Sequence, residues 1–263
     1  MAVQKTKAIV LGYYSLGEAD RIIVFYTRDY GKVRAVARGA RKIKSALCGR
    51  LEILTFGDLV FFQRADRDLH IINSFDIVDP FQVLREDILK MAYCSYFAEL
   101  LQQVESEDEA NADTFDLMLN VMSMMKSTDD PEMLARTFEI RLLTGAGFSP
   151  QLDSCVSCSK SIDQSGHFWK NGFSVSSGGV LCGECSRLDP NAVFISRGTV
   201  EVMKRIQRAP LELIPRLRMS EVNRQELKGV FSKFISFHVG NKRLNSLDFL
   251  ASIESESSFS RAC

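Results

Sequence analysis

Two Cys-x-x-Cys motifs constrain this chain more than any other feature. Cys155 and Cys158 form the first pair, and Cys182 and Cys185 form the second. A two-residue spacing lets both thiolates of a pair bind one ion, and two pairs complete a tetrahedral sulfur shell. Such a closed shell leaves no position for a substrate. The sequence therefore predicts one structural Zn²⁺, with an iron–sulfur cluster or redox-active cysteine pairs as alternatives.

The cysteine pairs lie in a segment that is rich in Ser and Gly, and residues 151–190 are expected to form a zinc finger. His167 lies between the pairs, where it would be a surplus ligand, so we expect it at the surface. It is followed by Phe168 and Trp169, which excludes the His-x-Glu motif of the zinc deaminases. The total of seven cysteines is odd, which argues against a complete disulfide framework and fits reduced thiols in the cytosol.

The first 80 residues have the pattern of a small β-barrel. Their β-rich runs are short, and polar or glycine-containing turns separate them; the runs cover residues 7–14, 21–27, 32–37, 58–63 and 69–77. No helical pattern intervenes. Five short strands in a domain of this size predict a five-stranded OB-fold barrel over residues 1–80.

Helical patterns begin after Pro80. Apolar residues at helical spacing predict helices in residues 81–150, and Asp130 followed by Pro131 is typical of a helix start. Ser196 and Ser220 are expected to cap two further helices in residues 191–250. We therefore expect an α+β multidomain protein: an OB-fold barrel, then an all-helical domain in two parts with the zinc finger inserted between them. Residues 251–263 are rich in Ser and are expected to form a disordered tail.

The charges are balanced overall but unevenly distributed. The chain has 33 Lys and Arg against 33 Asp and Glu, yet residues 31–50 contain seven basic residues and no acidic one. A basic face and loop on an OB barrel are typical of nucleic-acid binding. The alternative is a solvated surface without a partner. The candidate DNA-binding residues are Lys32, Arg34, Arg38, Arg41, Lys42, Lys44 and Arg50, with Tyr13, Tyr14, Phe25, Tyr26, Phe61 and Phe62 as candidate stacking aromatics.

Two other charged regions admit more than one interpretation. Residues 99–116 contain seven acidic residues and no basic one, which indicates a helix end and an exposed loop. A basic protein partner or the protein's own basic face are the other interpretations. The basic residues of 191–250 suit a solvated helix face, a second nucleic-acid surface or a dock for an acidic peptide.

No enzyme motif is present. The sequence lacks a Walker-type loop, a Rossmann fingerprint and a His-Glu-x-x-His motif, and its three histidines assemble no catalytic set. We expect a non-enzymatic protein without a membrane partner, because no apolar run approaches the roughly 18 residues that span a bilayer. The expected location is the cytoplasm, on the nucleoid when bound to DNA.

Several short motifs, in this order, resemble the RecO family of bacterial recombination mediators. They are Leu16–Arg21, Phe25–Thr27, Gly39–Arg41, Phe138–Leu143 and Gly147–Pro150, followed by Cys155 and Cys158. Because the zinc cysteines vary within this family, their presence here indicates a four-cysteine subgroup.

The resemblance implies an activity and a set of partners. RecO-like proteins bind single- and double-stranded DNA and anneal complementary strands. They work with RecR, and often RecF, to load RecA onto strands covered by single-strand-binding protein, whose acidic C-terminal tail they recognise. By position, the DNA-binding role falls on Lys32, Arg34, Arg38, Arg41, Lys42 and Lys44. An OB-fold and zinc module that binds RNA in transcription or translation is the alternative function.

Overall fold

The computed structural model describes residues 2–42, 45, 47–63, 69–107, 109–162, 172–240 and 244–261. These residues form two compact units. The first comprises residues 1–127 together with 244–263, and the second comprises residues 128–243.

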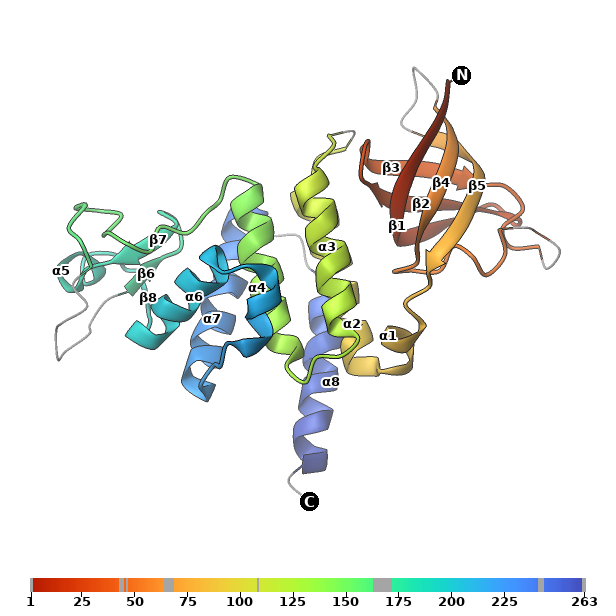
Figure 1. The fold of residues 1–263 in the computed structure, drawn as a ribbon. Coiled ribbons are helices and arrows are strands. Elements are labelled where there is room, and N and C mark those ends of the chain that lie inside the picture. Colours follow the sequence, from red (N-terminus) through yellow and green to blue (C-terminus); the bar gives the residue numbers. More distant parts are fainter. Residues whose placement is uncertain are drawn as a thin grey trace. The chain divides into compact units, whose positions relative to one another are not determined.

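The first unit begins with a closed five-stranded barrel (Figure 1). Its strands follow the order β1-β2-β3-β5-β4, in which β3 and β5 are parallel and the other neighbouring pairs are antiparallel. This topology confirms the predicted OB-fold. Alternate side chains of every strand fill the interior of the barrel, among them Val10, Phe25 and Phe61. The strands are β1 Ala2–Leu16, β2 Asp20–Thr27, β3 Gly31–Ala37, β4 Phe56–Gln63 and β5 Leu69–Asp79.

Helices complete the first unit. They are α1 Gln82–Glu86, α2 Ile88–Val104, α3 Ala112–Met125 and α8 Asn245–Arg261. Asp87 caps α2 and Asn111 caps α3, because each side chain accepts hydrogen bonds from backbone N–H groups that the helix leaves unpaired. The last helix, α8, packs along α2 (Figure 1). The Tyr93 hydroxyl of α2 donates a 2.7 Å hydrogen bond to Glu254 of α8.

The second unit combines helices with the cysteine segment. Its elements are α4 Pro131–Gly145, β6 Gly172–Ser174, β7 Gly179–Leu181, α5 Gly183–Ser186, β8 Val193–Phe194, α6 Arg197–Arg208, the 3-10 helix η1 Leu211–Arg216 and α7 Glu221–His238. The predicted caps are confirmed: Asp130, Ser196 and Ser220 each accept a hydrogen bond from the third residue after them. One face of α7 is buried in the core, with Leu227, Val230, Phe231, Phe234 and Ile235.

Two expectations about the organisation differ from the structure. The tail predicted to be disordered over residues 251–263 is helical through Arg261, because α8 buries Leu250 and Ile253 in the first unit. The compact units also divide differently from the predicted domains, since the helices up to Ser127 group with the barrel. Among the described residues, no helix combines the length and apolar character needed to cross a bilayer.

Candidate nucleic-acid interface and four-cysteine site

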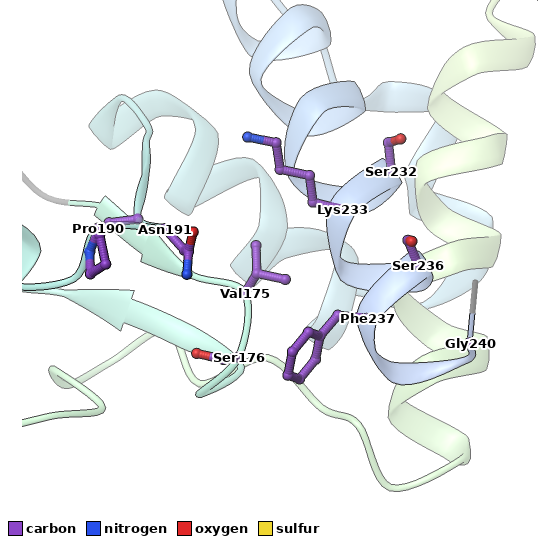
Figure 2. Close-up of a pocket in the computed structure, with 10 residues that line it drawn as sticks. Val175, Ser176, Pro190, Asn191, Ser232, Lys233, Ser236, Phe237 and Gly240 are labelled. Carbon is purple, nitrogen blue, oxygen red and sulfur yellow. The ribbon is translucent and has the colours of Figure 1, made fainter.

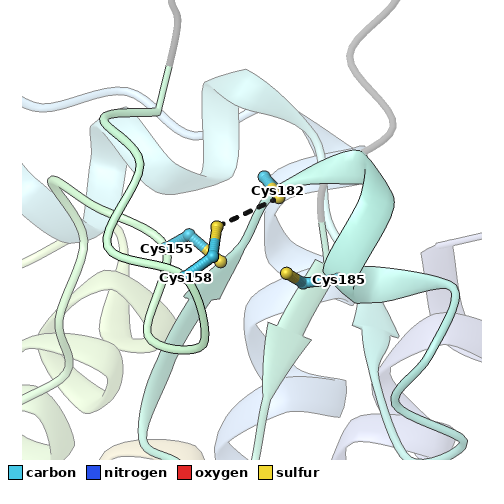
Figure 3. A group of neighbouring side chains, drawn as sticks. All are labelled: Cys155, Cys158, Cys182 and Cys185. Carbon is cyan, nitrogen blue, oxygen red and sulfur yellow. Dashed lines mark hydrogen bonds between the residues drawn. The ribbon is translucent and has the colours of Figure 1, made fainter.

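The four cysteines of the two motifs converge (Figure 3). Their sulfur atoms all lie within 4.8 Å of one another, and the sulfur atoms of Cys158 and Cys182 are 3.8 Å apart. A tetrahedral shell with metal–sulfur bonds of 2.3 Å requires sulfur atoms about 3.8 Å apart. The donor set and its spacing therefore fit one metal ion.

The protonation of the quartet also fits a cation. Burial raises the pKa of the Cys155 thiol, but backbone N–H groups of Cys182, Cys158 and Ser157 donate hydrogen bonds that outweigh burial and lower the pKa to about 6. The Ser157 side chain lowers the pKa of Cys185, but hydrogen bonds with the Cys182 and Cys158 thiols raise it to about 12. Four thiols this close resist ionising together, so a divalent cation would displace their protons on binding.

An exposed ion pair connects the two Cys-x-x-Cys turns. Lys160, two residues after Cys158, donates a 3.0 Å hydrogen bond to Glu184, which lies between Cys182 and Cys185. Glu184 and the nearby thiols raise the pKa of Lys160. A cation beside thiolate ligands reduces the negative charge of the cluster.

Apart from Arg34 on β3, the exposed cations of the basic stretch that the structure describes lie after β3. Arg38, Arg41 and Lys42 are exposed, as is Arg50, whose guanidinium lies 3.7 Å from Asp76. The Arg41 guanidinium donates to the Gly17 carbonyl at 3.1 Å, which fixes the loop against the turn between β1 and β2. Lys44 lies outside the described residues. The loop therefore presents several cations to solvent.

Lys32 and Arg34 lie on β3 and bind the protein's own chain. The Lys32 ammonium donates to the carbonyls of Gln102 and Glu105, at 3.0 and 3.2 Å, and so caps the last turn of α2. Arg34 forms an ion pair with Glu107. Because they lie two residues apart on a strand, both residues point to the same face, and the segment between α2 and α3 packs against that face.

This segment, residues 105–111, is called the acidic connector below. Its backbone forms a parallel β-bridge from Glu107 to Lys32, and Glu109 packs on Gly31. The pKa of Glu105 is raised, mainly by burial. The hydroxyls of Thr114 and Tyr26 donate hydrogen bonds that oppose this rise, and the negative charge of Glu109 adds to the rise. The described residues therefore bear out two of the interpretations of the acidic stretch: it is a helix end followed by an exposed loop, and that loop contacts the protein's own basic face.

The candidate aromatic residues divide between core and surface. Phe25, Tyr26 and Phe61 are buried, and Tyr26 stacks on Phe115 of α3 with ring centroids 6.2 Å apart. Tyr14 is 62% exposed and Tyr13 is 38% exposed. Phe62, on β4, is half-buried. The two candidates that are exposed, Tyr13 and Tyr14, both lie towards the end of β1.

The second unit contains a hollow of about 750 Å³ (Figure 2). Lys233, Ser236 and Phe237 line it from α7, and Val175 and Asn191 line it from the cysteine segment. Figure 2 shows the Phe237 ring between Val175 and the end of α7. Local sequence patterns do not indicate this hollow, because its walls come from segments about 40 to 60 residues apart.

Comparison with known proteins matches most of the chain to one family. Residues 1–81 match the model "Recombination protein O N terminal", and residues 85–248 match "Recombination protein O C terminal". The DNA repair protein RecO of Symbiobacterium thermophilum is 33% identical over 257 residues, which cover 97% of this chain and 99% of that protein. That of Alkaliphilus metalliredigens is 31% identical over 250 residues, which cover 95% and 99%.

Proposed function

Because the chain belongs to the RecO family of DNA repair proteins, we propose that it is a recombination mediator that acts without catalysing a reaction. In this proposal it binds single- and double-stranded DNA and anneals complementary strands. Together with RecR, and with RecF where that protein takes part, it helps load RecA onto strands covered by single-strand-binding protein. The family match does not favour the RNA-binding alternative.

The exposed cations after β3 carry the DNA-binding part of the proposal. Arg38, Arg41 and Lys42 lie together on the barrel, and Lys44 belongs to the same loop in the sequence. Phosphate contacts release counterions and supply most of the affinity without reading the sequence. Annealing requires two polyanions to approach each other, and a cationic surface lowers their repulsion. Base pairing between the strands then supplies the specificity.

Zinc is the metal that we propose for the four-cysteine site. Four thiolates at tetrahedral spacing are the usual ligand set of structural zinc. Cys155, Cys158, Cys182 and Cys185 would hold one ion. Its role would be to stabilise the segment by holding the two Cys-x-x-Cys turns together beside β6 and β7.

The hollow of the second unit is our candidate site for the acidic tail of single-strand-binding protein. Lys233 supplies a cation at its wall, Asn191 supplies an amide, and Val175 and Phe237 supply apolar surface. A Lys233→Glu variant should lose binding to a peptide of that tail, and an Arg197→Glu variant should not. Equal binding by the wild type and Lys233→Glu would exclude this site.

Charge reversal tests the DNA-binding surface. A variant with Arg38→Glu, Arg41→Glu and Lys44→Glu should bind a single-stranded oligonucleotide more weakly at low salt. The slope of log affinity against log salt should fall by about 2 to 3, since each phosphate contact contributes about 0.7 to 0.9. Fluorescence anisotropy titrations at several salt concentrations measure both quantities.

A matched control reverses three exposed cations of the second unit, Arg197, Arg205 and Arg216. It changes the net charge equally and should retain the affinity. An unchanged affinity of the first variant would refute the loop assignment. An equal loss in both variants would indicate a second nucleic-acid surface, and a marked preference for RNA would refute the mediator function.

A further inference from the structure

An apolar row crosses the outside of the barrel. The register places Tyr14 opposite Ile22 and Ile22 opposite Val36, and parallel pairing continues the row to Ile71. Directly opposed residues point to the same side of a sheet. The row lies on the outer face, because Ile23 belongs to the barrel core and side chains alternate along a strand.

The row is accessible and has an aromatic end. Tyr14 is 62% exposed, and Ile22, Val36 and Ile71 are half-buried. Aliphatic side chains beside an exposed ring form a flat apolar surface of the kind on which another ring can stack. The other end of the same face, at Lys32, is covered by the acidic connector.

Cations border the open part of the row. Arg38 follows Val36 by two residues and is exposed. Arg41 donates its hydrogen bond to Gly17, in the turn that follows the strand of Tyr14. A ligand on the row would therefore meet apolar surface and positive charge together.

We propose that Tyr14, Ile22 and Val36 form a base-stacking platform for single-stranded DNA, with Arg38 and Arg41 at the phosphates. This inference rests on the proposed function. Unpaired bases have π-faces that stack on aromatic and apolar side chains, and this contact tolerates any base sequence. The bases of a duplex are already stacked on one another, so a duplex would meet the cations alone. The Tyr14 ring would thus set a preference for single strands.

An abasic oligonucleotide separates stacking from charge. The full-length protein is titrated with a thymidine oligonucleotide, with an abasic oligomer that has the same number of phosphates, and with a duplex. The wild type should bind the thymidine strand at least about fivefold more tightly than the abasic strand, since one stacked base contributes at least that much. Tyr14→Ala and Tyr14→Leu should lose this ratio, and Tyr14→Phe should keep it. Their affinity for the duplex and their salt slopes should stay unchanged.

Phe194→Ala is the matched control, because Phe194 is an aromatic residue of the second unit that is 65% exposed. This variant should bind all three probes like the wild type. If Tyr14→Leu retains the ratio between the thymidine and abasic strands, the platform is refuted while the DNA-binding function stands. If the wild type binds none of the probes, the proposed function itself fails. Tyr14→Leu keeps apolar area at the site, so a folding defect in Tyr14→Ala alone does not decide the outcome.

Discussion

At the scale of single residues, Gly31 is the position at which the acidic connector packs most closely on the barrel. Its φ is +62°, and a Cβ atom there would lie 2.2 Å from the carbonyl oxygen of Glu109. A side chain at this position meets two penalties, a strained backbone and a clash with backbone atoms. The strain is a property of the local turn, but the clash cannot be read from the local sequence, because Glu109 is distant along the chain.

Gly31→Ala should therefore destabilise the protein more than Gly17→Ala does. Gly17 also has a positive φ, of +61°, but open space surrounds it, so its substitution costs about 1–2 kcal/mol for the backbone alone. Denaturant unfolding of both variants measures the difference. Equal losses of unfolding free energy would show that the connector does not pack on Gly31 in solution.

Asp130 makes the stability of the second unit depend on acidity. Burial raises the pKa of this carboxyl, but hydrogen bonds from Arg224 and from the Met133 N–H outweigh burial and lower it. Its stabilising contribution is thus complete above the unfolded-state pKa of about 4 and is lost as the pH falls through the lowered folded-state pKa.

Asp130→Asn keeps the helix cap but loses the charge that faces Arg224. We expect it to lower the unfolding free energy at neutral pH by about 1.5–3 kcal/mol, the range for a hydrogen bond to a charged group. The difference from the wild type should shrink as the pH drops below 4. Chemical denaturation from pH 3 to 7 tests this, with the exposed neighbour Asp129→Asn as control. A difference that does not change with pH would contradict the expectation.

At the scale of elements, the cysteine segment should depend on its metal. Cys182→Ser leaves three thiolates, so the metal content should fall from about one zinc per chain towards zero. The thermal midpoint of the second unit should fall as well, because binding free energy is folding free energy for such a segment. Elemental analysis and thermal unfolding measure both, and Cys48→Ser, at an exposed isolated cysteine, is the control. Intact folding without metal would refute the structural role.

The acidic connector should compete with DNA for Arg34. Glu107→Gln removes the charge that faces this guanidinium. We expect the affinity for single-stranded DNA to rise at low salt and the salt slope to steepen by about 0.7, as one more phosphate contact becomes available. Glu86→Gln on α1 changes the net charge equally and should change the slope far less. Identical slopes for both variants would show that Arg34 stays out of reach.

Local sequence patterns predict most of the helices and strands. The features that they do not predict depend on contacts between residues far apart in the chain. The five strands, the caps at Asp130, Ser196 and Ser220, and the convergence of the cysteines all follow from alternation, capping chemistry or spacing. The engagement of Lys32 and Arg34 does not, because their partners lie about 70 residues further along the chain. The DNA-binding residues themselves stay a prediction. Helix α8 was missed because its Ser-rich composition hides Leu250 and Ile253, whose burial depends on α2.

At the scale of the whole molecule, the neutral total charge conceals an internal pairing. Part of the basic stretch is neutralised by the acidic connector within the first unit, as the Arg34–Glu107 ion pair shows. Next to these segments, Arg28 contacts Asp116 of α3 at 2.8 Å. The cations after β3 stay exposed. The net charge of zero therefore does not describe the field that a nucleic acid would meet at that loop.

Removal of α8 should disrupt the first unit selectively. A chain that ends at residue 243 loses the buried Leu250 and Ile253, the Tyr93–Glu254 hydrogen bond, and the contact of Glu99 with the N–H of Ser246. We expect hydrogen exchange to accelerate in α2 and to stay slow in α4 and α7. Unchanged protection of α2 would show that it needs no cover from α8.

The return of α8 to α2 has a consequence for biosynthesis. Ribosomes deliver the chain from its N-terminus, so α2 leaves the exit tunnel about 150 residues before the helix that covers it. The second unit has all of its sequence available first and can fold while the first is still incomplete. A nascent chain would therefore expose the apolar side of α2 until α8 has left the ribosome, so we expect a chaperone to bind this helix during synthesis.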